Sequence, residues 1–299
     1  MRFAICTSIY EAARPFFNEW IDSAVAASAG YETQVIISLD GVDKTDPGLE
    51  YLSNVLPLAF TRALPEPSIS QVRSAMINRA IECDADILVF CDIDDRLEDN
   101  AFSLHATALE TSDFSYGDMR PITRDGSALE PTFFGDSAVP RLISKAESII
   151  DRNWLGFSNT AIWRTRLPSA GYKIPKGIIA VDWWLFTTFL KNNMTGKQAD
   201  SVVCKYRIHG ANLLGHRPLP TLEGTKKRLN ISKKHYEAFP SDILACHRLK
   251  RINNLIAEIN ERPRQMQLAI ESACANAVLW YEDIAQLIEI SSAADSAAL

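Results

Sequence analysis

The sequence lacks any apolar run long enough to cross a membrane, and it lacks paired cysteines. Its longest apolar runs, such as residues 87–91, are far shorter than the roughly 18 residues that a membrane span needs. Six cysteines are scattered over 299 residues, with no Cys-x-x-Cys pair and no Cys/His cluster at zinc spacing. We therefore expect no transmembrane helix and a reducing, cytoplasmic setting.

An excess of positive charge is also absent. The net charge is −6, and residues 1–210 carry 20 Lys and Arg against 27 Asp and Glu, while residues 211–299 carry 11 against 10. Bulk attraction to nucleic acid is not expected from such a chain. A body this acidic needs a cation to bind a phosphorylated ligand.

The pattern of apolar residues predicts an α/β fold. Short β-rich runs alternate with segments of helical spacing in the first half of the chain, which is typical of βαβ units and a largely parallel sheet. The strands are expected at residues 2–7, 34–39, 87–91, 114–119, 159–164 and 201–208. The helices are expected at residues 14–29, 70–83, 100–110 and 181–192, with a loose, proline-containing stretch between residues 41 and 69.

The character of the sequence changes near residue 218. Beyond Pro218 and Pro220 only helical patterns follow, at residues 222–238, 242–260 and 264–290, and residues 291–299 are expected to form a frayed tail. The last of these helices is expected to pack on the preceding body or on a second copy of the chain, as in a homodimer.

Three acids directly follow the most apolar predicted strand. Asp92, Asp94 and Asp95 come after residues 87–91, at the edge of the sheet where ligands bind in open parallel folds. Like charges this close repel one another unless a cation lies among them, and Mg²⁺ or Mn²⁺ prefers such oxygen ligands. The alternative is a solvated turn that caps the next helix.

Six motifs occur in order along the chain: the opening strand FAICTSIY, the LDG turn, the SISQVR segment, the DIDD acids, the VDWWL segment and YRIHGAN at residues 206–212. Together they resemble the family 2 inverting glycosyltransferases of the GT-A fold. The resemblance covers about residues 2–215. It implies a GT-A α/β domain at residues 1–217, with donor binding in 1–110 and the acceptor and catalytic part in 111–217, followed by a helical extension at 218–299.

The resemblance implies a role for individual residues. Nucleotide contacts fall on Thr7, Tyr10, Asp40, Arg73 and Asp92. Metal ligands fall on Asp94 or Asp95, with His209 at the metal or the diphosphate. The sequence departs from the family pattern at three places. The LDG turn lacks the first Asp and the Ser of an Asp-Asp-Gly-Ser turn, and Val181 replaces a Glu. The usual Ala-Arg-Asn run around Arg73 is broken, and residues 77–79 offer a competing alignment for it.

The catalytic base implied by the resemblance is Asp182. A helix N-cap is the alternative for this residue, since Asp often serves there. Trp183 is a candidate for stacking on a sugar, although tryptophan in such a segment often belongs to the core. Ser158 and Asn159 are candidates for hydrogen bonds to sugar hydroxyls, or form a turn into the strand that follows.

The implied activity is metal-dependent transfer, with inversion, of a sugar from a UDP, dTDP or GDP donor. The acceptor is a saccharide or a lipid-linked molecule, and the family points to bacterial surface polysaccharide or lipopolysaccharide assembly. One rival is a nucleotidyltransferase, which usually carries a Gly-rich phosphate loop that residues 8–14 do not have. The other is a nucleotide- or glycan-binding protein without catalysis.

A basic segment follows the region of resemblance. Residues 217–251 carry nine Lys and Arg against three acids. On helices such a cluster is usually a solvated face. The functional alternative is a peripheral contact with anionic lipid at the inner membrane face, near a lipid-diphosphate acceptor.

Overall fold

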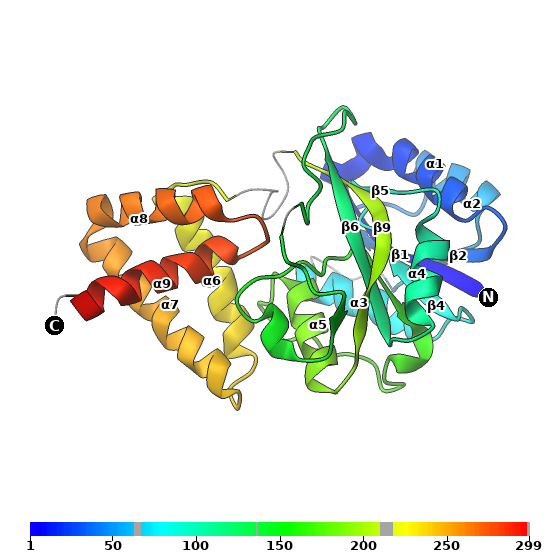
Figure 1. Cartoon of the computed structure of the whole chain (residues 1–299). Coiled ribbons are helices and arrows are strands. Elements are labelled where there is room, and N and C mark those ends of the chain that lie inside the picture. The colour runs from blue at the N-terminus through cyan, green and yellow to red at the C-terminus, as the bar shows by residue number, and fades with distance from the viewer. Residues whose placement is uncertain (63–66, 136, 210–217, 298–299) are drawn as a thin grey trace.

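A computed structural model describes residues 1–62, 67–135, 137–209 and 218–297 of the chain. A mixed sheet flanked by helices forms the larger part, and four helices form the rest (Figure 1). Residues 210–212, which end the YRIHGAN motif, and residue 217 lie outside the described ranges. Within those ranges, no helix combines the length and hydropathy required to cross a bilayer.

The sheet follows the order β3-β2-β1-β4-β8-β6-β9-β5, with β7 also paired to β9. The strands are β1 (Arg2–Tyr10), β2 (Glu32–Asp40), β3 (Leu58–Phe60), β4 (Ile87–Phe90), β5 (Arg96–Leu97), β6 (Phe114–Ile122), β7 (Leu142–Ile143), β8 (Thr160–Trp163) and β9 (Gly196–Arg207). The first four in this order are parallel, as are β6 and β9, whereas β8 runs antiparallel to both its neighbours. The predicted, mainly parallel sheet is present.

Alternation along β1 explains how helices cover the two faces of the sheet. Successive side chains of a strand point to opposite faces. Phe3 stacks on Phe102 of α4 (Ala101–Leu109), with ring centroids 4.4 Å apart. Ser8 instead contacts Met76 of α3 (Ile69–Ile81), with its hydroxyl 3.7 Å from the sulfur. The even-numbered residues of β1 therefore share a face with α3.

The first half of the chain holds elements that the sequence pattern did not predict. The stretch expected to be loose contains β3 and α2 (Pro47–Val55). The N-terminus of α2 is well defined, because the Asp46 side chain accepts a hydrogen bond from the Gly48 N–H at 2.9 Å and Pro47 fills the first helical position. The helix predicted at residues 14–29 is present as α1 (Phe17–Ala27), and a short 3₁₀ helix that was not predicted, η1 (Glu11–Phe16), precedes it.

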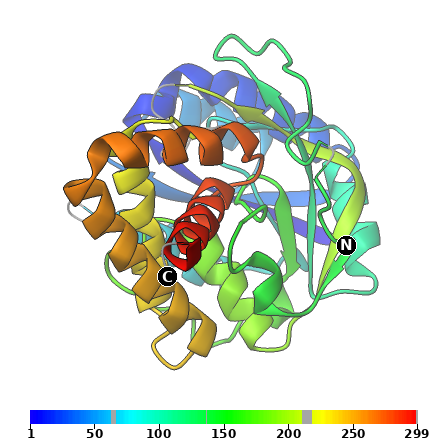
Figure 2. The ribbon, with the colours of Figure 1, turned by 60° about the vertical axis from the view of Figure 1, so that its left-hand side comes forward.

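The C-terminal helices are α6 (Leu222–Glu237), α7 (Ile243–Glu261), α8 (Pro263–Asn276) and α9 (Glu282–Ala297). They lie together in front of the sheet in the rotated view of Figure 2. The single helix predicted over residues 264–290 is wrong, since the chain turns between α8 and α9. The predicted frayed tail is also wrong as far as Ala297, because α9 continues to that residue. Leu279 and Ile284 are buried within the chain, whereas Leu268 is 71% exposed.

A buried ion pair joins α6 to α9. The Arg228 Nε lies 2.7 Å from Asp283 Oδ2, and the two side chains are only 8% and 4% exposed. The Arg228 guanidinium also donates to the Leu219 carbonyl and the Thr225 hydroxyl, each at 3.1 Å. A pair this well hydrogen-bonded holds the helices in register, because removing one partner leaves a buried charge without compensation.

We predict that Arg228→Ala lowers the free energy of unfolding by about 3–5 kcal/mol, since Asp283 is left unpaired. Urea unfolding of the full chain measures this loss. The matched control is Lys227→Ala, which changes an exposed neighbour and is expected to alter stability by less than about 0.5 kcal/mol. A loss of that small size for Arg228→Ala would contradict the role of the pair.

Candidate active site

A cavity of about 400 Å³ opens where β1, β2 and β4 end. Its lining includes Tyr10 at the end of β1, Asp40 at the end of β2, and the three acids that follow β4. The strands β1, β2 and β4 are parallel neighbours, so their carboxyl ends lie at one edge of the sheet. This is the edge at which open α/β sheets bind ligands.

The three acids form one cluster. Asp92, Asp94 and Asp95 can each offer an oxygen within 4.8 Å of the others. Burial raises the pKa of Asp95 well above its usual range, and the charges of Asp94 and then Asp92 add to the effect. One Asp95 oxygen accepts the Arg207 N–H at 2.7 Å, while the other is buried without a hydrogen-bond partner in the described part of the chain. The cluster therefore fits a divalent cation, which would supply the missing positive charge and oxygen contact.

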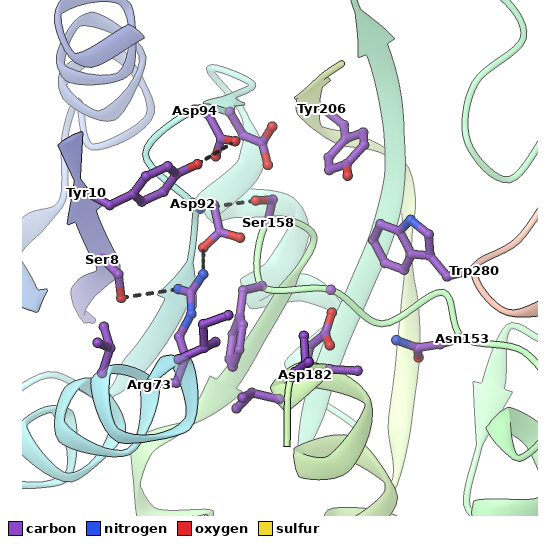
Figure 3. Close-up of a pocket in the computed structure, with 18 of the residues that line it drawn as sticks. Ser8, Tyr10, Arg73, Asp92, Asp94, Asn153, Ser158, Asp182, Tyr206 and Trp280 are labelled. Carbon is purple, nitrogen blue, oxygen red and sulfur yellow. Dashed lines mark hydrogen bonds and ion pairs between the residues drawn. The ribbon is translucent and has the colours of Figure 1, made fainter. Parts of the chain in front are cut away.

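Arg73, from α3, contacts the first acid of the cluster. Its Nη2 lies 2.6 Å from Asp92 Oδ1, and its guanidinium stacks over the Phe157 ring at 4.8 Å (Figure 3). Burial works to lower the pKa of Arg73, but the carboxylate of Asp92 outweighs it and the pKa is raised. Burial in turn raises the pKa of Asp92, against the opposing effect of Arg73. The ion pair holds the Arg73 guanidinium in the cavity wall, beside the acid cluster.

Tyr10 and His209 fix the second acid. The Tyr10 hydroxyl donates to Asp94 Oδ2 at 2.9 Å, and His209 Nε2 lies 2.8 Å from the same oxygen. Both side chains come from strand ends far apart in the sequence. His209 is thus close enough to share a cation with Asp94 or to orient that carboxylate.

Arg207 is fully buried behind the cluster. Its guanidinium donates to the Asp94 carbonyl at 2.9 Å, to the Arg124 carbonyl at 2.7 Å and to Glu19 at 2.7 Å. It also lies over the Phe16 ring at 4.6 Å. These contacts hold the loop after β4 against β9 and α1.

Asp182 faces the same cavity from the start of α5 (Val181–Lys191). Burial raises the pKa of its carboxyl to about 7, although the Trp183 N–H donates to it at 2.7 Å. The N-cap of the helix is Ala180, so Asp182 lies in the first turn and does not serve as the cap. An acid with a pKa near neutrality can take up a proton at physiological pH.

The structure brings together most, but not all, of the residues predicted for the site. Those that line the cavity are Tyr10, Asp40, Arg73, Asp92, Asp94, Asp95, Ser158 and Asp182. The Ser158 hydroxyl accepts the Asp92 N–H at 3.1 Å. His209 reaches the cluster through Asp94.

Three predicted residues lie outside the cavity lining. Thr7 is fully buried on the odd-numbered face of β1, and its neighbour Ser8 lines the cavity in its place. Asn159 is fully buried, and its amide donates to the Gly117 and Trp154 carbonyls, which supports a turn and not a sugar contact. Trp183 is fully buried between the rings of His235 and Tyr281, and its indole N–H donates to the Ile149 carbonyl.

The sequence analysis missed part of the lining. Tyr206, Asn153, Trp280 and Tyr281 all face the cavity, the last two from the turn between α8 and α9. Tyr206 lies within the YRIHGAN motif, which could have indicated it. No local pattern marks Trp280 and Tyr281 as a turn, so the sequence analysis placed both inside a helix.

Comparison with known proteins shows the fold. No family model matches the chain, and no curated protein does either. The structure of S. aureus TarS 1–349 in complex with UDP-GlcNAc aligns with a TM-score of 0.56 at 14% identity, over 99% of this chain and 92% of that one. The mannosyltransferase PcManGT from Pyrobaculum calidifontis, in complex with GDP-Man and Mn²⁺, aligns with a TM-score of 0.55 at 16% identity, over 98% and 79%.

At such identities the likeness of this chain to the two solved structures concerns the fold alone. The chain has the GT-A architecture of a curled, mostly parallel sheet flanked by helices, with a helical C-terminal part. The fold predicted from the sequence is confirmed.

The raised pKa of Asp182 predicts a change in stability with pH. An unfolded Asp ionises near pH 3.9, whereas the folded carboxyl does so at about pH 7. The folded state binds this proton more tightly than the unfolded state does. The contribution of Asp182 to the free energy of unfolding therefore decreases as the pH rises from about 3.9 to about 7, and it is constant above pH 7. Asp182→Asn removes the effect, and its thermal midpoint in EDTA should exceed that of the wild type by about 2 °C or more at pH 8, and by less at pH 5.

The matched control for this prediction is Asp200→Asn, a change at an exposed surface acid. We expect its thermal midpoint to follow that of the wild type at both pH values. An Asp182→Asn variant that is equally stabilised at pH 5 and pH 8 would show that the carboxyl titrates normally.

Proposed function

We propose that this chain is a metal-dependent, inverting glycosyltransferase that moves a sugar from a nucleoside-diphosphate donor to a saccharide or lipid-linked acceptor. One observation carries the proposal. The acid cluster after β4, paired with Arg73, and the carboxyl of Asp182 line the same cavity. A nucleotide-sugar transfer with inversion requires both groups: countercharge for the leaving diphosphate and a base for the incoming hydroxyl.

The proposed reaction assigns a task to each part of the site. Asp92, Asp94 and Asp95, with His209, would hold Mn²⁺ or Mg²⁺, which neutralises charge on the diphosphate when bound. Asp182 accepts the proton of the acceptor hydroxyl, whose oxygen bonds to the anomeric carbon as the bond to the diphosphate breaks. Arg73 adds a positive charge beside the first acid, and Tyr10 fixes the orientation of Asp94.

The nature of the donor is supported by the solved structures that share the fold. TarS 1–349 was solved with UDP-GlcNAc, and PcManGT was solved with GDP-Man and Mn²⁺. We therefore propose UDP, GDP or dTDP sugars as donors. The assignment to family 2 and to bacterial surface polysaccharide or lipopolysaccharide assembly rests on the sequence motifs, and so does the division into a catalytic domain at 1–217 and an extension at 218–299.

A thermal-shift panel tests the donor site. UDP, GDP, dTDP, CMP and ADP are each added with and without Mn²⁺ or Mg²⁺, and one nucleoside diphosphate is expected to stabilise the protein only with metal. At 100 times its dissociation constant, such a ligand adds about 2.7 kcal/mol. Asp94→Asn should remove the metal-dependent part of this gain, whereas Asp200→Asn should retain it. No stabilisation by any nucleotide would overturn the proposal.

Turnover tests the chemistry of the same site. With the nucleotide sugar chosen by the panel, Asp182→Asn should keep the stabilisation by nucleotide and metal but lower the release of nucleoside diphosphate by about 10²–10⁴-fold. Stabilisation of the wild type without turnover would favour a nucleotide- or glycan-binding protein without catalysis. Val181, which stands where the family usually has a Glu, supports that alternative. Release of pyrophosphate from a nucleoside triphosphate would favour the nucleotidyltransferase instead.

We also propose that the basic segment 217–251 contacts anionic lipid. Arg228, Lys234 and Arg248 pair with acids, while Lys227 and Lys250 are exposed on α6 and α7. An exposed Lys near an anionic surface contributes about 1 kcal/mol of attraction.

The Lys227→Glu/Lys250→Glu double variant should therefore sediment with phosphatidylglycerol vesicles at least tenfold less than the wild type, as about 1.4 kcal/mol corresponds to a factor of ten. Lys145→Glu, a change at another exposed lysine, is the control and should sediment like the wild type. Equal sedimentation of the double variant and the control would show that the segment is a solvated face. Equal binding of the wild type to neutral phosphatidylcholine vesicles would show that anionic lipid is not what the protein recognises.

A further inference from the structure

The turn between α8 and α9 forms one wall of the cavity. Trp280 and Tyr281 line it, although they lie about 100 residues beyond Asp182 in the sequence. The Asn153 N–H donates to the Trp280 carbonyl at 2.8 Å, in an isolated antiparallel bridge. The indole lies against Gly156, where a Cβ would come within 2.7 Å of Trp280 Cη2. The turn is therefore fitted closely to the loop before β8.

Tyr281 holds a backbone conformation that side chains rarely adopt. Its φ is 67°, in the left-handed region, which is uncommon for an aromatic residue and costs energy. Its ring stacks on Trp183 with centroids 4.4 Å apart, and Trp183 stacks on His235 at 3.8 Å. The stack compensates the strained turn. Strain of this kind is concentrated at binding and catalytic sites.

The wall is aromatic, and Trp280 lies across the cavity from Ser8 and Tyr10 (Figure 3). Trp280 meets Tyr206 in a T-shaped contact, with centroids 5.8 Å apart. Figure 3 shows Trp280, Tyr206 and Asn153 on one side, Ser8 and Tyr10 on the other, and Asp182 between them. In an inverting displacement the acceptor approaches from the side opposite the leaving group. Trp280 therefore lies on the side from which an acceptor would approach Asp182.

We propose that the Trp280–Tyr281 turn is the acceptor subsite and that it binds a sugar ring, which stacks on the Trp280 indole with a hydroxyl directed to Asp182. The inference rests on the proposed function and narrows the acceptor to a saccharide end. Sugars present a face of C–H groups that packs against aromatic rings, and Trp offers the largest such surface. A lipid chain has no comparable ring face. In this inference one turn of the extension at 218–299 completes the site of the catalytic domain.

Saturation-transfer NMR on the full chain tests this subsite. The probes are the methyl glycosides of glucose, galactose, mannose and N-acetylglucosamine, with Mg²⁺ and the nucleoside diphosphate selected by the thermal-shift panel. At least one glycoside should bind the wild type. Its affinity for Trp280→Ala should be about tenfold lower, and its affinity for Trp280→Phe, which keeps an aromatic face, should stay within about threefold of the wild-type value. Val278→Ala, in the same turn but exposed, is the matched control and should bind like the wild type.

Thermal stabilisation by nucleotide and Mg²⁺ separates binding from folding. It should be the same in all four proteins, because Trp280 lies away from the donor groups. The inference is overturned by unchanged glycoside binding in Trp280→Ala, by loss of nucleotide stabilisation in the same variant, or by a wild type that binds nucleotide but no glycoside. A wild type that binds no nucleotide overturns the proposed function, and a Trp280-dependent glycoside signal in that same sample would still support a sugar subsite.

Discussion

Repulsion among three carboxylates is the constraint on which this structure depends. Asp92, Asp94 and Asp95 follow β4, a strand buried along its whole length, and their oxygens lie within 4.8 Å of one another. Charges so close and so little hydrated are unfavourable without compensation. The chain supplies it from distant segments: Arg73 pairs with Asp92, and Arg207 holds the backbone of the loop. The site is therefore assembled only when the sheet is complete.

A second, aromatic network joins the helical part to the site. Tyr281, Trp183 and His235 stack in a row that spans the α8–α9 turn, α5 and α6. Trp183 directly follows Asp182, so the same packing that buries the tryptophan orients the acid beside it. Burial also raises the pKa of Asp182 to about 7. The partial dehydration of that carboxyl is the physical reason for its raised pKa, which the proposed role as a base would use.

The sequence indicated six of the nine strands in the described residues, most helices and the acids, because each depends on local pattern. Side chains two positions apart on a strand share a face, so Ser8 lies on the same face of β1 as Tyr10, and Thr7 lies on the other face. Because Tyr10 was predicted to face the ligand, this alternation could have indicated Ser8 in place of Thr7. The helix predicted through residues 264–290 was wrong because a turn made of Trp280 and Tyr281 has no glycine or proline to mark it. The α2 helix was missed although Asp46 and Pro47 form a recognisable start.

The sequence by itself determined that acids end the strands of an α/β sheet and that basic, helical sequence follows, since composition and periodicity are local properties. Only the tertiary structure decided which side chains meet. It turned Trp183 into the core, set Asn159 to hold a turn, and brought Trp280 to the wall of the cavity. These outcomes depend on packing between segments that lie up to more than a hundred residues apart, and no local pattern along the chain records such contacts.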